Sequence, residues 1–145
     1  GAMPPEEVRR HMEKADIYLF TSDFNEGWGA VLNESMNSGC AVVASHAIGS
    51  VPFLIKNGEN GLIYENGNQL DLEKQVLRLL EDGAFRKKIA ENAYETMINL
   101  WNAETAAERF LTLTEKLLKN ENTDSLFLDG PCSKAAILKN DWYQH

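Results

Sequence analysis

The residues best suited to chemistry lie together in one stretch, SDFNEGWGAVLNESMNSG, which covers residues 22–39. Two carboxylates frame it, because Glu26 comes just before Gly27-Trp28-Gly29 and Glu34 follows eight residues after Glu26. Glycines let a ligand approach the backbone closely. The spacing by itself indicates a loop carboxylate and a helix carboxylate that lie near the start of one helix.

Two apolar segments and an amphipathic helix position these residues. The segments IYLFTS, residues 17–22, and CAVVAS, residues 40–45, predict two buried strands. Between them, apolar residues at helical spacing predict a helix that begins after Gly29 and ends at Gly39. The free N–H groups of a helix's first turn and the helix dipole favour negative charge. A strand, a glycine-bearing loop and a helix start therefore predict an anion-binding corner.

The longer string EGWGAVLNESMNSGCAVVAS, residues 26–45, is much more specific than the spacing of the two carboxylates. It resembles the EGFG-x-x-x-x-EAMA-x-G-x-PVVA segment of retaining glycosyltransferases of the group 4 family, which have the GT-B fold and use nucleotide sugars. The resemblance carries specific motifs from Ala15 to Tyr64 and continues more weakly to Leu118. It implies that the chain is the C-terminal, donor-binding part of such an enzyme.

The resemblance also implies a role for each polar group of the corner. Glu26 would bind hydroxyl groups of the donor sugar, and it is the residue that we assign to catalysis. Glu34 would bind the ribose hydroxyls, and backbone amides near Gly29 would meet the phosphates. The donor site implied in this way consists of Glu26, Gly27, Trp28, Gly29, Ala30, Val31 and Glu34.

Several residues of this region have a structural interpretation as well. Gly27 and Gly29 are explained by the turn that the backbone makes in this loop. This explanation is compatible with contact between the same residues and a phosphate. Trp28 takes the place usually held by phenylalanine and is interpreted as a packing residue. Ser22 and Asn25 either hydrogen-bond the ligand or satisfy the backbone of the loop. His46 stands alone after the second strand and is interpreted as an ordinary loop residue, with ligand contact as the alternative.

Composition and charge suit a single globular domain. The chain has 145 residues, 43% of them hydrophobic, and a formal net charge of −8. This acidity argues against nucleic-acid binding, which needs a basic surface. No apolar run approaches the roughly 20 residues of a membrane span. Cys40 and Cys132 lie far apart without a C-x-x-C partner. We therefore expect a buried thiol at Cys40 and a reducing cytoplasm rather than a disulfide scaffold.

The alternation of strand and helix patterns predicts an α/β fold, a partial Rossmann-like domain with a short parallel sheet of about three strands and a helical C-terminal half. Ligands of such sheets bind outside the carboxyl ends of the strands, where loops 21–29 and 46–50 lie. The first strand is expected to be covered on both faces. The predicted strands span residues 17–20, 40–45 and 62–64, and the predicted helices span residues 4–16, 51–56, 69–81, 83–100 and 103–118.

The chain divides into three parts by sequence pattern. Residues 1–3, GAM, are interpreted as the scar of an expression tag and are set aside. Residues 4–119 form the predicted donor-binding subdomain. Residues 120–145 are interpreted as a tail that wraps another surface or stays mobile, and SKAAILKNDWY, residues 133–143, predicts a short closing helix.

The resemblance implies that important parts of the parent enzyme lie outside this sequence. These are the acceptor domain and the first strands of the donor domain, which carry the arginine and lysine that neutralise the diphosphate. We therefore expect the chain alone to be inactive as a transferase. The strand at residues 17–20 would become a sheet edge, which invites pairing with another chain and predicts a homo-oligomer.

These observations predict a donor-binding fragment of a retaining hexosyltransferase that acts on a glycan or lipid-linked acceptor in polysaccharide biosynthesis. No cofactor or metal is expected, because no His, Cys or Asp cluster has metal-ligand spacing. The resemblance implies a cytoplasmic location, peripheral at the inner face of the membrane. The alternative is a non-catalytic Rossmann-like module that binds a nucleotide or a partner protein. The sequence has no Walker A, G-x-G-x-x-G or G-x-S-x-G motif.

Overall fold

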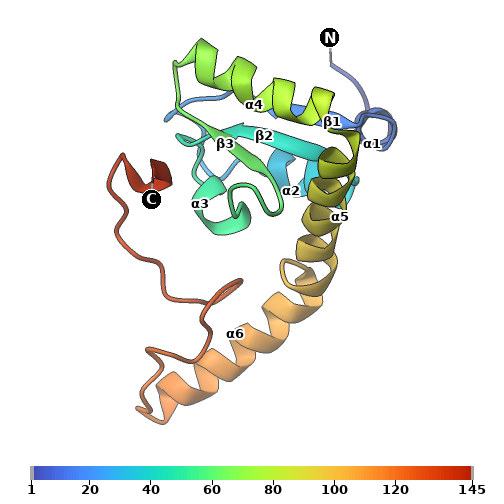
Figure 1. Cartoon of the computed structure of the whole chain (residues 1–145). Helices are drawn as coiled ribbons and strands as arrows, with labels where there is room; N and C mark the ends of the chain where they lie inside the picture. The colour runs from blue at the N-terminus through green and yellow to red at the C-terminus, as the bar shows by residue number, and fades with distance from the viewer. Residues whose placement is uncertain (1, 145) are drawn as a thin grey trace.

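Three short strands form one parallel sheet in the computed structural model, which describes residues 2–144 (Figure 1). The strands β1 (Ile17–Phe20), β2 (Ala41–Ser45) and β3 (Leu62–Tyr64) lie in the order β1-β2-β3. Helix α2 (Val31–Asn37) joins β1 to β2, and α3 (Val51–Leu54) joins β2 to β3. The predicted α/β fold with a three-stranded parallel sheet is confirmed.

Four longer helices and one short turn make up the rest of the fold. They are α1 (Pro5–Met12), α4 (Gln69–Glu81), α5 (Gly83–Asn99), α6 (Ala103–Leu118) and the 3-10 turn η1 (Trp142–Gln144). The first helix ends at Met12 rather than at Asp16, because the chain must turn to enter β1. No helix between residues 2 and 144 is both long and apolar enough to cross a membrane.

Side-chain caps fix where the three long C-terminal helices begin. The side-chain oxygens of Asn68, Asp82 and Asn102 each accept a hydrogen bond from the backbone N–H three residues later, at 3.0, 2.9 and 2.8 Å. Such caps satisfy one free donor of the first turn, and their loss costs about 1 kcal/mol. The sequence predicts caps at Asp82 and Asn102, since Asp and Asn are favoured at this position and directly precede helical patterns, and the structure confirms both.

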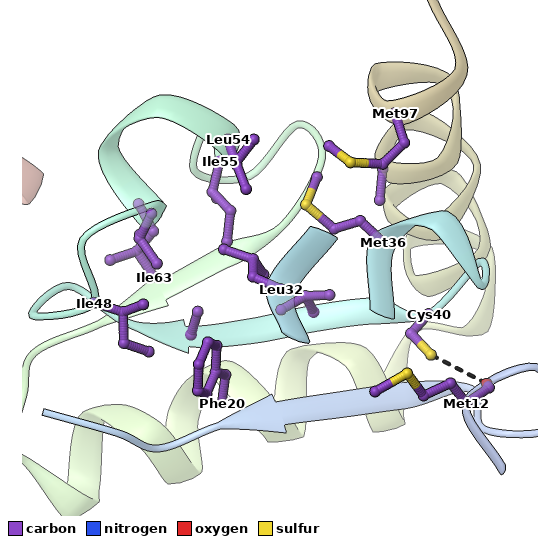
Figure 2. Close-up of a cluster of buried hydrophobic side chains, with 14 residues drawn as sticks. Met12, Phe20, Leu32, Met36, Cys40, Ile48, Leu54, Ile55, Ile63 and Met97 are labelled. Atoms are coloured by element: carbon purple, nitrogen blue, oxygen red, sulfur yellow. Dashed lines mark hydrogen bonds between the residues drawn. The ribbon is translucent and has the colours of Figure 1, made fainter. Parts of the chain in front are cut away.

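Helices cover both faces of the sheet, and each face has its own apolar cluster. On one face α2, α3 and α5 enclose the larger cluster (Figure 2), which includes Phe20, Leu32, Met36, Ile48, Leu54 and Met97. On the other face α4 and α5 enclose the smaller cluster of Ala41, Val43, Leu62, Tyr64, Leu79 and Ile89. Every residue of β2 is buried, as expected for the central strand of a parallel sheet covered on both faces.

The thiol of Cys40 is buried in the larger cluster, as predicted (Figure 2). Its Sγ donates a hydrogen bond to the carbonyl of Met12 at 3.2 Å. Burial raises the pKa of this thiol, and the negative charge of Asp16 raises it further. Cys40 is therefore a protonated packing residue that links α1 to the start of β2.

Three expectations about burial and local structure are wrong. The strand β1 is not covered on both faces, since Leu19 is 45% exposed. Apolar residues at helical spacing predict an inner face for α6, but the helix extends away from the sheet (Figure 1) and leaves that face in solvent, with Leu118 79% exposed. The predicted closing helix is reduced to η1, because residues 134–141 are exposed and bury no apolar face that would stabilise a helix.

Candidate functional site

The two loops at the carboxyl ends of β1 and β2 are joined by backbone hydrogen bonds. The N–H of Gly49 donates to the carbonyl of Gly27 at 3.0 Å, and the N–H of Ser50 donates to the carbonyl of Trp28 at 3.1 Å. A Cβ at Gly49 would lie 2.3 Å from the carbonyl oxygen of Gly27. Only glycine allows this approach, so the second loop holds the Glu26–Gly29 loop in place.

The start of α2 presents free backbone donors beside this loop. Within residues 2–144, the N–H groups of Gly29, Ala30 and Val31 donate to no backbone or side-chain acceptor. Gly29 has φ +74° and packs against Phe20, which brings the backbone round into the helix. Free N–H groups at a helix start bind anions, and the structure confirms that the sequence assembles the predicted strand–loop–helix corner.

The two carboxylates of the sequence motif both lie within electrostatic reach of β1. Glu26 is half-buried and accepts a hydrogen bond from the hydroxyl of Ser22 at 3.2 Å, whereas Glu34 is exposed on α2. Both act on Tyr18, a half-buried residue of β1. Burial raises the pKa of Tyr18 most, and the negative charges of Glu34 and Glu26 raise it further. Sequence reasoning missed Tyr18, although it lies within electrostatic reach of both glutamates.

A groove of about 500 Å³ runs between α1 and α2, with Glu34 on its rim. Its other walls are mostly apolar, and it is lined by Met3, Pro5, Val8, Arg9, Met12, Asn37 and Ser38. A second hollow of about 570 Å³ on the α5 side of α2 also reaches Glu34. The first groove combines apolar walls with one carboxylate, which suits a flat ring that carries hydroxyl groups. No sequence pattern indicates this groove, because it arises from how α1 packs on α2.

Trp28 packs against two other aromatic rings, in keeping with its interpretation as a packing residue. Its ring stacks on Phe53 with centroids 5.8 Å apart and tilts against Trp101 at 5.7 Å. Its indole N–H donates to the side-chain oxygen of Asn33 at 2.9 Å. Trp28 therefore joins the Glu26–Gly29 loop to α3 and to the segment between α5 and α6.

The remaining candidates differ in what their side chains contact. Asn25 bonds Asp23 within the loop, through its backbone N–H at 2.8 Å and its side-chain amide at 3.0 Å. His46 is buried, and its Nδ1 accepts a hydrogen bond from the N–H of Asn66 at 2.9 Å. Its ring meets the edge of Phe24, with centroids 5.6 Å apart. Asn25 thus satisfies hydrogen-bonding groups of its own loop, whereas His46 packs against that loop through Phe24.

Comparison with known proteins identifies the family. A family model described as "Glycosyl transferases group 1" matches residues 1–96. This chain belongs to that family. The D-inositol 3-phosphate glycosyltransferase of Corynebacterium glutamicum (strain R) is 32% identical to it over 121 residues, which cover 83% of this chain and 28% of that protein. The chain spans only 28% to 31% of the length of the first three curated relatives that it matches.

Solved structures of glycosyltransferases share the fold. The C-terminal domain of a group 1 glycosyl transferase from Francisella tularensis matches with a TM-score of 0.65 and 30% identity, over 71% of this chain and 52% of that one. Anabaena HepE, solved in complex with UDP, matches with a TM-score of 0.55 and 27% identity, over 77% of this chain and 28% of that one. The predicted resemblance to the C-terminal part of a GT-B glycosyltransferase is confirmed.

Proposed function

We propose that this chain is the donor-binding part of a retaining glycosyltransferase, which transfers a hexose from a nucleotide-diphosphate sugar to a glycan or lipid-linked acceptor. The observation that carries the proposal is the meeting of three free amides with Glu26 and Glu34 at the carboxyl ends of the strands, in a chain of the glycosyl transferases group 1 family. A nucleotide-diphosphate sugar presents phosphate oxygens to amides and hydroxyl groups to carboxylates. One ligand therefore satisfies both kinds of group.

The diphosphate fits the start of α2. The amides of Gly29, Ala30 and Val31 supply donors, and the positive end of the helix backbone supplies favourable charge. HepE, which shares the fold, was solved in complex with UDP, and this supports a nucleoside diphosphate as the ligand of this chain. Glu26, in the loop ahead of these amides, would then face the hydroxyl groups of the sugar.

The nucleoside fits the groove between α1 and α2. Glu34 on its rim would accept hydrogen bonds from the two ribose hydroxyls, and its apolar wall at Val8 and Met12 would contact the flat base. A hydrogen bond to a charged group contributes about 1.5–3 kcal/mol, so Glu34 would account for a large part of the affinity for the nucleoside.

In the proposed reaction, the bond between the anomeric carbon and the phosphate oxygen breaks, and the electron pair leaves with the nucleoside diphosphate. A bond from that carbon to the acceptor oxygen forms on the same face of the sugar, and the proton of the acceptor hydroxyl passes to the departing phosphate oxygen. The amides at the start of α2 would stabilise the charge that develops on the leaving diphosphate. That no metal or cofactor takes part, and that the enzyme works at the cytoplasmic face of the membrane, stay predictions.

A nuclear magnetic resonance titration tests the donor site. Isotope-labelled protein is titrated with UDP, GDP and ADP, and the backbone amides of residues 26–34 are followed. We expect saturable shifts with one nucleotide. Glu34→Ala should weaken that binding by about 1–3 kcal/mol, which is roughly 5- to 150-fold. Glu81→Ala, an exposed position on α4, is the matched control and should change nothing. An unchanged affinity in Glu34→Ala would overturn the assignment.

We expect the chain alone to transfer no sugar, because the proposal places the acceptor domain and the basic diphosphate clamp outside it. Incubation with radiolabelled UDP-, GDP- and ADP-hexoses and a mixture of glycan and lipid acceptors should yield no labelled product above background. Transfer by the purified chain would show this expectation to be wrong. Binding without transfer would also fit the alternative of a non-catalytic nucleotide-binding module, which transfer by a longer form of the protein would exclude.

A further inference from the structure

The chain beyond α6 doubles back toward the candidate site. Residues 120–144, here called the C-terminal strap, leave the far end of α6 and return to the side of the molecule where the strands have their carboxyl ends (Figure 1). The family match ends at residue 96, so the strap lies outside it. The family model therefore assigns no role to the strap.

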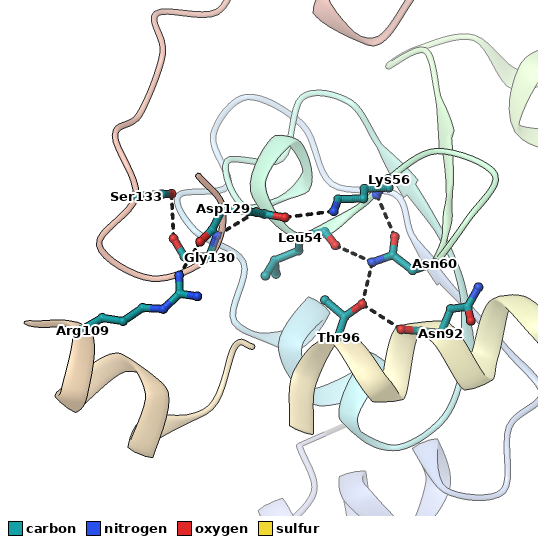
Figure 3. A network of polar contacts seen from close by, with 9 residues as sticks. All are labelled: Leu54, Lys56, Asn60, Asn92, Thr96, Arg109, Asp129, Gly130 and Ser133. Carbon is teal, nitrogen blue, oxygen red and sulfur yellow. Dashed lines mark hydrogen bonds and ion pairs between the residues drawn. The ribbon is translucent and has the colours of Figure 1, made fainter. Parts of the chain in front are cut away.

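The strap is anchored half-way along by polar contacts (Figure 3). The carboxylate of Asp129 pairs with the ammonium of Lys56 at 2.9 Å. The guanidinium of Arg109 on α6 donates to the carbonyls of Asp129 and Pro131. Gly130 has φ +80° and is buried, and a Cβ there would lie 2.6 Å from the side chain of Leu100. These contacts fix the strap beside α3 and α5.

The end of the strap lies on the wall of the candidate site. The ring of Tyr143 lies 4.1 Å from the ring of His46, centroid to centroid, with an angle of 32° between the planes. Trp142 and Tyr143 also pack against the larger apolar cluster. His46 in turn meets Phe24 in the loop that carries Glu26. Three aromatic rings thus run from the end of the strap to the loop of the donor site.

The segment between the anchor and the end is tied to the strap itself, where the ammonium of Lys134 lies 2.6 Å from the carboxylate of Asp124. Residues 134–141 are all exposed, and Ile137 is fully so. The end of the strap is therefore attached mainly by the rings of Trp142 and Tyr143, and it can detach while the anchor at Asp129 and the core stay in place. Segments with few buried contacts open at low cost in free energy.

We propose that the C-terminal strap is an autoinhibitory cover of the donor site, whose end occupies the approach to the Glu26 loop and must leave when a nucleotide sugar binds. This inference rests on the proposed function. A ligand of this fold enters from outside the carboxyl ends of the strands, which is the side on which Tyr143 rests on His46. The apparent affinity for the donor then equals the affinity of the open form multiplied by the fraction of molecules in which the strap is open.

The test compares donor binding with and without the aromatic end of the strap. Isothermal titration with UDP-glucose, GDP-mannose and ADP-glucose is carried out on the unaltered chain and on the double variant Trp142→Ala, Tyr143→Ala. We expect the double variant to bind one of these donors about tenfold more tightly, as for a strap that is open in roughly one molecule in ten. Ile137→Ala, in the exposed part of the strap, is the matched control and should bind like the unaltered chain.

The outcomes separate this inference from the proposed function. If the unaltered chain and the double variant bind a donor with equal affinity, the strap does not cover the site. The proposed donor site is not affected by that result. Weaker binding by the double variant also overturns the cover, since the strap would then support the site. If neither protein binds any of the three donors, both proposals fail. A truncation after Lys139 repeats the comparison and must agree with the double variant.

Discussion

Gly29 sets the position of the free amides, because it turns the backbone from the loop into α2 at φ +74°. A Cβ at this position would lie 2.9 Å from the ring of Phe20 and 3.0 Å from Ile48. We expect Gly29→Ala to lower the free energy of unfolding by about 1–3 kcal/mol, through both backbone strain and overpacking. Urea-induced unfolding followed by circular dichroism measures the change.

Gly27 provides the control for this prediction. It lies in the same loop, its φ is not positive, and a Cβ there would meet nothing within 4 Å. Gly27→Ala should therefore change the free energy of unfolding by less than about 0.5 kcal/mol. A similar loss in both variants would show that the loop needs flexibility rather than the particular conformation of Gly29.

His46 makes the stability of the fold depend on pH. Burial lowers the pKa of His46, although the backbone at Tyr64 and the charge of Glu65 oppose this. Below the ordinary value of 6.5 the unfolded chain binds a proton that the folded chain does not, so folding loses free energy as pH falls from 6.5 toward the lowered pKa. Unfolding curves between pH 7.5 and 5.5 should show this loss.

The variant His46→Phe keeps an aromatic ring at this position and removes the titration. We expect its free energy of unfolding to fall less steeply between pH 6.5 and 5.5 than that of the unaltered chain. His11→Gln removes an exposed histidine on α1 instead and should leave the slope unchanged. If His46→Phe kept the full slope, another group would have to carry the pH dependence.

At the scale of the elements, α5 ties the two sides of the sheet together. Its Ile89 belongs to the cluster under α4, whereas Ala93 and Met97 belong to the cluster under α2. Ile89 is fully buried, so Ile89→Ala should lower the free energy of unfolding by about 2–5 kcal/mol. Ile98→Ala changes the same residue type on the same helix at a position 45% exposed, and should cost much less. Thermal and urea unfolding of both variants decide the matter.

The sequence predicted these elements well wherever local patterns determine them. The caps at Asp82 and Asn102 mark the starts of α5 and α6, and the apolar run of residues 40–45 marks β2. The apolar face of α6 was misjudged, since helical spacing shows that a face exists but not what it packs against. Burial of Leu19 was misjudged for a related reason, because a short apolar run does not show how many neighbours a strand has.

In the candidate site too, local sequence patterns determine some features and tertiary packing determines the others. Glu26 and Glu34 come to one corner because a strand, a loop and a helix that follow one another in sequence position them. Tyr18 and the groove at Val8 and Met12 were not predicted, since they depend on the packing of α1 against α2 and on the position of β1. The contact of Tyr143 with His46 spans almost a hundred residues of sequence and leaves no local pattern.

For the molecule as a whole, the sheet edge at β1 is the feature most open to association. Within the described residues β1 pairs only with β2, so one side of its backbone lacks strand partners. Leu19 adds an exposed apolar side chain at this edge. An unprotected edge strand promotes pairing with another chain, whereas the net charge of −8 opposes contact between two copies.

We expect pairing at the β1 edge to outweigh charge repulsion at high protein concentration and physiological salt, where the repulsion is screened within about 8 Å. The chain should then form a homodimer or larger homo-oligomer, and lowering the salt should favour the monomer. Leu19→Lys places a charge on the edge and should abolish association, whereas Leu118→Lys on exposed α6 should not. Sedimentation velocity over a concentration series distinguishes these cases. If Leu118→Lys alone gave a monomer, the interface would lie on α6, and a monomer at every concentration would rule out both surfaces.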